Sequence, residues 1–289
     1  MATSDATSAG SSDGASPRNV ALLNVENISK RFQTADGETT AVDGMSFTVA
    51  AGEFVSIIGP SGCGKSTVFN IIGGLVGDYD GQVRVAGDVV SGTHPAIGMV
   101  FQEESTFPWR NVIENVAFPL EIAGVPKHER LEQAAHFVSM VGLRGFERHF
   151  PAELSGGMRQ RVALARTLSS KPKLLLMDEP FAALDEQTRL LLGDKVLQIQ
   201  QELKQTTLLI THNLTEAVQL SDRVLVMTYR PGRLKRVVDV GLPHPRDSAV
   251  VSSDAFGHCV AQIWQDLREE ASRGIQDDES RVLHAGAKR

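Results

Sequence analysis

The chain has 289 residues, enough for one large or two ordinary domains, and its 42% hydrophobic and 22% charged residues are typical of a globular protein with a sizeable core. No apolar run approaches the roughly 20 residues that cross a bilayer, and the polar start lacks the apolar core of a secretory signal. A net charge of −6 argues against nucleic acid as a partner. The two cysteines, Cys63 and Cys259, are far apart, which argues against a disulfide framework and fits a reducing cytoplasm.

The first part of the chain predicts a disordered tail and then an antiparallel β region. Residues 1–19 are rich in Ser, Ala, Gly, Thr and Asp, a composition that buries nothing. Imperfect alternation over 22–28 predicts a strand with one solvated face, and a turn signal follows at 35–37. Residues 45–49 and 83–85 are further strand candidates.

A glycine-rich stretch at 59–67 follows the apolar run 54–58 and precedes helix-compatible sequence. It fits G-x-x-x-x-G-K-[ST], the phosphate-binding P-loop, in the strand-before, helix-after context that distinguishes this motif from an ordinary turn. Its backbone N–H groups can wrap a polyphosphate at the positive end of the next helix, Lys65 can reach the terminal phosphates and Ser66 can hold Mg²⁺. The predicted nucleotide-binding residues of this loop are Gly59, Pro60, Ser61, Gly62, Cys63, Gly64, Lys65, Ser66 and Thr67.

The middle of the chain predicts helices and a second anion site. Apolar residues recur at helical spacing over about 127–141, and the helix predicted from Ser155 to Ser170 is stopped by Lys171-Pro172. Ser155 is a good N-cap, and the two glycines after it expose backbone N–H groups at a helix start. Taken alone, this segment is better explained as an ordinary helix entry.

An acidic pair follows the apolar run 174–177, which is typical of a central parallel strand buried on both faces. Asp178 and Glu179 would then lie at the carboxyl end of that strand, where ligands bind in open α/β sheets. One carboxylate can hold Mg²⁺ with Ser66, and the next can polarise an attacking water. The upstream P-loop favours this interpretation over a solvated turn.

The last third predicts more strands and helices. Asp185 can cap a long helix to about Leu203, and helical periodicity returns over about 254–273 before a polar, frayed end at 274–289. Apolar runs that predict strands lie at 207–210, 224–227 and 234–240.

The P-loop, L-S-G-G at 154–157 and L-L-L-M-D-E-P at 174–180 together resemble the ATPase subunit of an ATP-binding cassette (ABC) transporter, in an order and spacing that match over about 22–246. The resemblance implies an α/β fold: a P-loop NTPase core, with a mostly parallel sheet and flanking helices, an antiparallel β subdomain and a helical subdomain. The ATPase domain is expected at 20–250, with its helical subdomain at about 103–170. A C-terminal helical extension and polar tail are expected at 251–289.

The resemblance also implies roles for ATP and Mg²⁺ ligands. Ser155, Gly156 and Gly157 match the signature motif, which contacts the γ-phosphate of ATP bound by a second copy, so that two chains sandwich two ATP molecules head to tail. Asp178 matches the Mg²⁺-associated aspartate, and Glu179 matches the catalytic glutamate.

Four further segments match known parts of the family. Gln102 matches the Q-loop, which senses Mg²⁺ or water and the transmembrane partner. Residues 183–185 match the D-loop, and His212 matches the switch histidine on the γ-phosphate. Phe32 matches the aromatic residue that stacks on adenine, although tyrosine is commoner there.

Two stretches resemble the nitrate/sulfonate/taurine importer group: residues 106–112, close to L-P-W-x-x-V, and residues 243–246, close to P-R-P-R, from which His244 departs. The resemblance implies ATP-driven import of a small anionic or organosulfur/nitrogen solute through a separate permease. The chain would lie at the cytoplasmic face of the inner membrane, served indirectly by a periplasmic or extracellular solute-binding protein.

Several alternatives stay open. A non-transport ABC ATPase acting on nucleic-acid or protein complexes would carry a basic face, a second cassette or a coiled coil. A P-loop kinase or GTPase is disfavoured by the signature segment and His212. Trp109 either receives a cytoplasmic helix of the permease or is a core aromatic beside a turn. Cys63 is either a thiolate whose modification blocks ATP binding, or a small residue tolerated in the loop.

Overall fold

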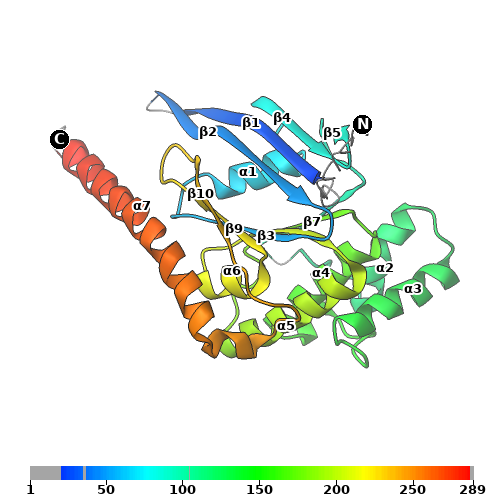
Figure 1. Ribbon diagram of the computed structural model, residues 1–289. Helices are drawn as coiled ribbons and strands as arrows, with labels where there is room; N and C mark the ends of the chain where they lie inside the picture. Colours follow the sequence, from blue (N-terminus) through cyan, green and yellow to red (C-terminus); the bar gives the residue numbers. More distant parts are fainter. Residues whose placement is uncertain (1–20, 35–36, 104, 287–289) are drawn as a thin grey trace, which may run out of the picture.

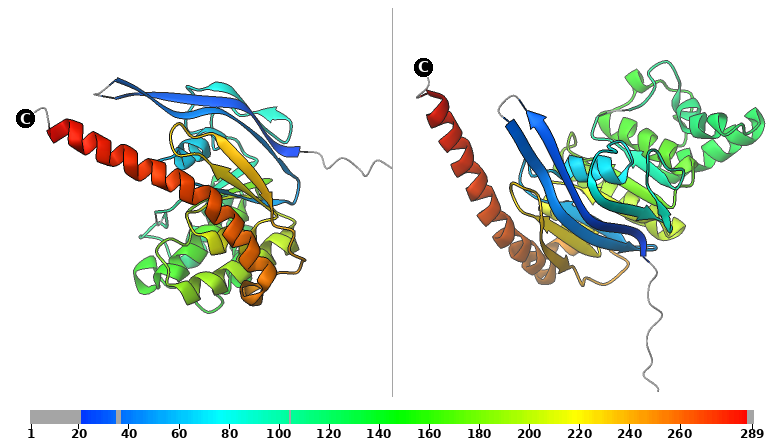
Figure 2. Two further views of the ribbon diagram at one scale, coloured as in Figure 1. Left: turned by 60° about the vertical axis from the view of Figure 1, so that its left-hand side comes forward. Right: turned by 90° about the horizontal axis from the view of Figure 1, so that it is seen from above.

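The computed structural model describes residues 21–34, 37–103 and 105–286, so the predicted tail at 1–19 lies outside the described residues. The described chain forms two sheets with helix α1 between them (Figure 1). Helices α4, α5 and α6 cover the other face of the larger sheet, and α7 runs along its edge (Figures 1 and 2). This arrangement confirms the predicted P-loop NTPase fold with an antiparallel sheet and a helical region.

The larger sheet has six strands in the order β10-β9-β3-β8-β7-β6. All neighbouring strands are parallel except β10 and β9. Every residue of β3 and β8 is buried, including Ser56, Thr206 and Thr207, and the other residues of both strands are apolar. The strands are β3 (Phe54–Ile58), β6 (Ile97–Val100), β7 (Leu174–Asp178), β8 (Thr206–Ile210), β9 (Arg223–Met227) and β10 (Leu234–Asp239).

The smaller, antiparallel sheet has the order β2-β1-β4-β5. Its strands are β1 (Ala21–Thr34), β2 (Gly37–Ala50), β4 (Asp80–Val85) and β5 (Asp88–Val89). The first two are longer than the stretches predicted at 22–28 and 45–49. Their added ends are largely exposed and polar, so they carry no hydrophobic alternation to reveal them.

The helices are α1 (Lys65–Ile72), α2 (Val112–Ile122), α3 (Lys127–Met140), α4 (Gly156–Ser169), α5 (Glu186–Leu203), α6 (Leu214–Leu220) and α7 (Asp254–Gly286), with short 3₁₀ helices at Pro151–Glu153 and Ser248–Ser252. Helices α2, α3 and α4 pack on one another and share one hydrophobic core. Within the described part of the chain, no helix is both long enough and apolar enough to cross a membrane.

Two helical predictions need correction. Helix α2 was not predicted, because Pro119 lies inside it, although the capping box of Asn111 and Glu114 marks its start. The frayed end predicted from residue 274 is wrong up to Gly286, because α7 continues to that residue. Polar residues such as Gln, Glu and Arg propagate a helix that packing has already nucleated. The division of the chain near residue 250 stays a prediction.

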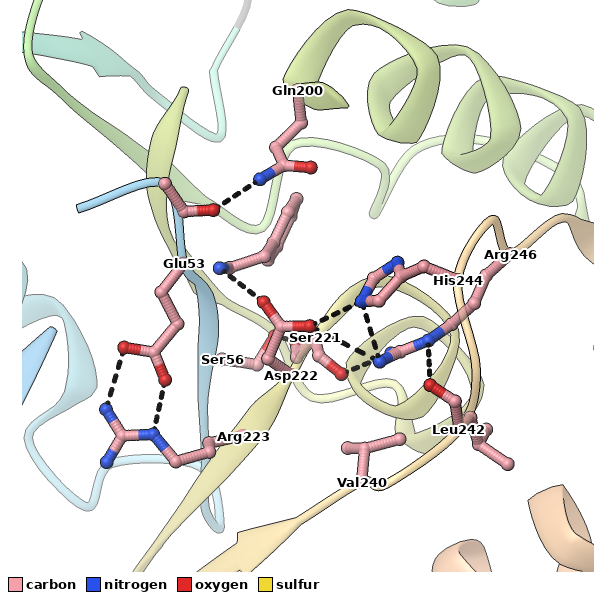
Figure 3. A network of polar contacts seen from close by, with 12 residues as sticks. Glu53, Ser56, Gln200, Ser221, Asp222, Arg223, Val240, Leu242, His244 and Arg246 are labelled. Carbon is pink, nitrogen blue, oxygen red and sulfur yellow. Dashed lines mark hydrogen bonds and ion pairs between the residues drawn. The ribbon is translucent and has the colours of Figure 1, made fainter. Parts of the chain in front are cut away.

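A polar network fixes the start of β3, the strand that leads into the P-loop (Figure 3). The Asp222 carboxylate accepts the Phe54 N–H at 3.0 Å and lies 2.8 Å from Nε2 of His244. The buried Arg246 guanidinium lies 3.3 Å from the same carboxylate. His244, which departs from the family's tail pattern, is therefore part of the support of this strand.

Candidate active site

The P-loop connects β3 to α1 and depends on glycine at two positions. Gly62 and Gly64 have φ angles of +72° and +100°, the left-handed region that favours glycine. A Cβ at Gly64 would lie 2.6 Å from the carbonyl oxygen of Ala41 in β2. The loop is therefore held both by its own conformation and by close packing against the antiparallel sheet.

The Lys65 side chain folds back into the P-loop. It is buried, and its Nζ donates hydrogen bonds to the carbonyl oxygens of Gly59 at 2.8 Å and Pro60 at 2.9 Å. An ammonium group has three donors, so Lys65 can keep a loop contact and still donate to a phosphate.

Asp178, the last residue of β7, lies close to the side chain of Ser66 in the P-loop. Burial raises the pKa of Asp178 above its ordinary value, and the neighbouring Glu179 charge acts in the same direction, while Ser66 and Lys65 oppose the shift. Two crowded carboxylates beside a hydroxyl form an oxygen-rich donor set, and a cation there would relieve the repulsion between the carboxylates. The residues present therefore fit Mg²⁺.

Glu179 and His212 meet at the carboxyl ends of neighbouring parallel strands. Nδ1 of His212 lies 3.0 Å from Oε2 of Glu179, which is one-fifth exposed. Glu179 has a φ angle of +44°, and its N–H donates to the Ile210 carbonyl at 2.8 Å. A side chain in the left-handed region costs about 1–2 kcal/mol, so the fold holds this carboxylate in place against local strain.

Sequence reasoning missed the cluster that supports His212. The buried Glu216 carboxylate accepts a hydrogen bond from Thr211 Oγ1 and pairs with Arg189 at 3.2 Å. The Thr211 hydroxyl in turn accepts the Asn213 N–H at 2.9 Å, on the far side of His212. The sequence signal was the N-x-x-E spacing from Asn213 to Glu216, where Asn213 caps α6.

The signature segment lies apart from this cluster. Ser155 is exposed and caps α4, its Oγ accepting the Met158 N–H at 3.3 Å. A Cβ at Gly157 would lie 3.3 Å from Thr188 and 3.5 Å from Leu184, so this glycine packs on the D-loop and the start of α5. Among the described residues, no hydrogen bond or ion pair joins the signature segment to the P-loop or to the acidic pair.

Gln102 and Phe32 occupy positions at the border of the site. Gln102 is exposed and lies two residues after β6, the strand beside β7. It therefore lies at the same end of the sheet as Asp178, where the parallel strands have their carboxyl ends. Phe32 is 41% exposed and pairs with Thr39 in β2, two residues before the carbonyl that touches the P-loop. The Phe32 ring is therefore partly exposed on the strand next to β2, with the Lys30 ammonium 5.1 Å from its centre.

Two local hypotheses are decided by burial. The reactive-thiolate hypothesis for Cys63 is wrong, because the side chain is fully buried and burial raises the thiol pKa above its ordinary value, despite Lys65 acting in the opposite direction. The core interpretation of Trp109 is also wrong, because its side chain is 72% exposed, with only one face near the Phe107 ring. Cys63 acts as a small core residue, and Trp109 belongs to the surface.

The comparisons with known proteins agree with this geometry. The ABC transporter family profile matches residues 42–182. An uncharacterised ABC transporter ATP-binding protein of Methanocaldococcus jannaschii is 47% identical over 84% of this chain and 91% of its own length. The nitrate transport protein NasD of Klebsiella oxytoca is 42% identical over 86% of this chain and 97% of its own length.

One more sequence relative and one solved structure match this chain. The aliphatic sulfonates import ATP-binding protein SsuB of Bacillus licheniformis is 41% identical over 92% of this chain and 98% of its own length. A dimeric ATP-binding cassette solved in a post-hydrolysis state with ADP and Pi matches with a TM-score of 0.68 and 30% identity, over 77% of this chain and 100% of its own. The chain therefore belongs to the ABC transporter family, as one of its ATP-binding and ATP-hydrolysing proteins.

Proposed function

We propose that this chain is the ATPase subunit of an importer for a small anionic solute of the nitrate or sulfonate type. It would act at the cytoplasmic face of the inner membrane through a separate permease served by a solute-binding protein. The support is the likeness to proteins named for nitrate transport and sulfonate import over nearly their whole length. No feature of the described structure favours the non-transport alternative.

ATP binding is assigned to the P-loop and its surroundings. Lys65 and the N–H groups of the loop spread the phosphate charge, helped by the positive end of α1. Phe32 is assigned to the adenine, since its ring is exposed on the strand next to β2. These interactions bind and orient the nucleotide before any bond is broken.

The metal is assigned to Ser66, Asp178 and Gln102. The hydroxyl and the carboxylate lie close to one another, and Gln102 follows the neighbouring strand at the same end of the sheet. Mg²⁺ held by these residues would supply positive charge that offsets the charge of the ATP phosphates.

Hydrolysis is assigned to Glu179 and His212. The Glu179 carboxylate orients the attacking water, and the His212 ring, 3.0 Å away, fixes the carboxylate and can donate toward the γ-phosphate. The positive φ of Glu179 fixes the direction of its carboxylate, and the hydrogen bond from Thr211 to the buried Glu216 holds the chain next to His212.

A shared ATP site is supported by the separation of the signature segment from the P-loop within the described chain. Ser155 exposes a capped helix start, and its hydrogen bond stays within its own turn. Such a helix start is suited to a γ-phosphate, which a second copy would present. We therefore propose a head-to-tail dimer in which each ATP contacts the P-loop of one chain and Ser155, Gly156 and Gly157 of the other.

The permease contact is assigned to the surface around Trp109. Its side chain is among the most exposed large apolar groups of the described chain, and it lies shortly after Gln102. An exposed aromatic anchor of this kind is typical of interface hot spots.

A mixing experiment tests the shared ATP site. Lys65→Ala removes the P-loop cation, and Ser155→Arg blocks the signature helix, so each variant alone should be inactive. In a 1:1 mixture half of the dimers are mixed, and each mixed dimer has one intact site, so about one quarter of the wild-type ATPase rate should return. A mixture as inactive as its parts, in the presence of dimers, would contradict the shared site.

The solute is tested by growth. Deleting this subunit should abolish growth on nitrate as nitrogen source or on a sulfonate as sulfur source, and restoring the wild-type chain should recover it. Lys65→Ala should not. Normal growth of the deletion strain on both classes would exclude the proposed solutes.

A further inference from the structure

The turn between β9 and β10, residues 228–233, contacts the P-loop on the side of its carbonyl groups. Nε of Arg230 donates to the Gly62 carbonyl at 2.9 Å. Gly232 packs closely on Cys63, the next residue of the P-loop: a Cβ on Gly232 would lie 2.1 Å from the Cys63 carbonyl oxygen. Two successive P-loop carbonyls therefore face this turn.

The orientation of these carbonyls also sets the orientation of the N–H groups. The C=O and N–H of one trans peptide point in opposite directions, so the Cys63 carbonyl facing Gly232 directs the Gly64 N–H away from the turn. That N–H belongs to the N-cap of α1, where a P-loop presents its donors to phosphate. Moving the turn would rotate a phosphate-binding group.

The turn is itself tied to the antiparallel sheet. The Gly232 N–H donates to the Ala41 carbonyl at 2.9 Å, and the Asp43 N–H donates to the Gly232 carbonyl at 3.0 Å. Within the turn, Thr228 Oγ1 donates to the Pro231 carbonyl at 2.7 Å. The position of Arg230 is thus set by the turn backbone on either side of it.

Helix α7 holds the other end of the same turn (Figure 2). Glu270 is buried, and its carboxylate accepts the Tyr229 N–H at 3.0 Å and pairs with Lys235 at 2.9 Å. The Tyr229 ring lies 5.6 Å from the Arg230 guanidinium and packs so closely on Gly274 that a Cβ there would lie 3.0 Å from the ring. The buried Glu270 carboxylate of α7 therefore binds Tyr229, the residue just before the one that contacts the P-loop.

We propose that Arg230 is a positioning residue of the nucleotide site and that Glu270 holds it in place, so that the docked C-terminal helix sets the affinity of the P-loop for ATP. This inference rests on the assignment of Gly59–Thr67 as the ATP site. Arg230 acts through the Gly62 carbonyl, and Glu270 acts through the Tyr229 amide.

The test measures the Kd of ATP by calorimetry, with KM and kcat of hydrolysis, on the full chain. Arg230→Gln should raise Kd and KM about tenfold and leave kcat at saturating ATP unchanged, because a hydrogen bond from a charged donor supports the loop. Arg230→Lys should recover part of the affinity. Glu270→Gln should raise Kd about threefold, and the double variant should be no weaker than Arg230→Gln.

Arg233→Gln is the matched control, since it removes the same charge from the same turn but from a side chain that pairs with Asp43. It should change Kd by less than twofold. Wild-type Kd in Arg230→Gln, or an equal rise in Arg233→Gln, would overturn the positioning role, and additive effects in the double variant would overturn the relay from Glu270. Thermal melting checks folding, and Arg230→Lys carries the test if Arg230→Gln unfolds. A wild-type chain that binds ATP no better than Lys65→Ala would instead contradict the ATP-site assignment.

Discussion

The two candidate phosphate-contacting regions of this chain are built in different ways. The cluster of Asp178, Glu179 and His212 lies at the ends of buried parallel strands, and its members touch one another or the P-loop. The signature segment at Ser155 lies exposed at the start of α4 and bonds within its own turn. The first region is assembled by folding one chain. The second has no hydrogen bond or ion pair to it among the described residues, which is why we propose that a second copy supplies its phosphate.

In the proposed dimer, control of hydrolysis would lie outside the single chain. A site completed by a second copy would stay inactive until the copies close, and a permease could govern that closure. The proposed role of Arg230 would add a second means of control within the chain, because α7 contacts the β9–β10 turn and this turn contacts the P-loop.

The largest effect is expected within the strand-end cluster. Glu179→Gln removes the carboxylate that orients water and should lower kcat about 10²–10⁴-fold while ATP still binds. Because ATP then persists, the variant should accumulate as a closed dimer in size-exclusion chromatography with light scattering. Glu202→Gln, at an exposed position in α5, is the control. Normal turnover in Glu179→Gln would remove the catalytic assignment.

A smaller loss is expected at the signature segment. Ser155→Ala should lower ATPase activity about tenfold, because a neutral hydroxyl contact is lost, and should lower the unfolding free energy by about 1 kcal/mol, because a cap is lost. Asn111→Ala removes the comparable cap of α2 and should cost similar stability without loss of activity. Denaturant melts and steady-state assays separate the two effects, and equal activity losses would make Ser155 a cap only.

The support of His212 should show in the pH dependence of stability. Burial raises the Glu216 pKa above its ordinary value, so the folded state binds this proton more tightly than the unfolded state does. Stability from this group is therefore lost as pH rises from the ordinary glutamate pKa through the raised one. Glu216→Gln should remove that slope, measured by denaturant unfolding across the same pH range. Glu132→Gln, at an exposed position, controls for the loss of a carboxylate, and an unchanged slope in Glu216→Gln would contradict the shift.

The smallest effect on the isolated chain is expected at Trp109. Because its side chain is 72% exposed, Trp109→Ala should change the unfolding free energy by less than about 0.5 kcal/mol and leave basal ATPase intact. With the permease present, the same variant should lose transport. Trp264→Ala, half-exposed on α7, is the control. A fall in basal ATPase would point away from a permease contact.

The P-loop, the acidic pair and the apolar runs of β3, β7, β8 and β9 could be predicted from the sequence, because these depend on local chemistry and short spacing. Strand β6 was not predicted. Continuous apolar runs such as 174–177 predict buried strands wherever they occur. Helix α2 escaped prediction because its internal Pro119 obscures the pattern, and the far ends of β1 and β2 escaped because exposed strand residues need no alternation.

The burial and the long-range contacts of each side chain could be known only from the tertiary structure. Cys63 and Trp109 each allowed two interpretations from sequence, and burial of the first and exposure of the second chose between them. The contact of Arg230 with Gly62 joins residues 168 positions apart, and the contact of Tyr229 with Glu270 joins residues 41 positions apart. Sequence spacing carries no signal for such contacts, because they exist only when the sheet has brought β9 beside β3 and α7 has packed against both β9 and the turn that follows it.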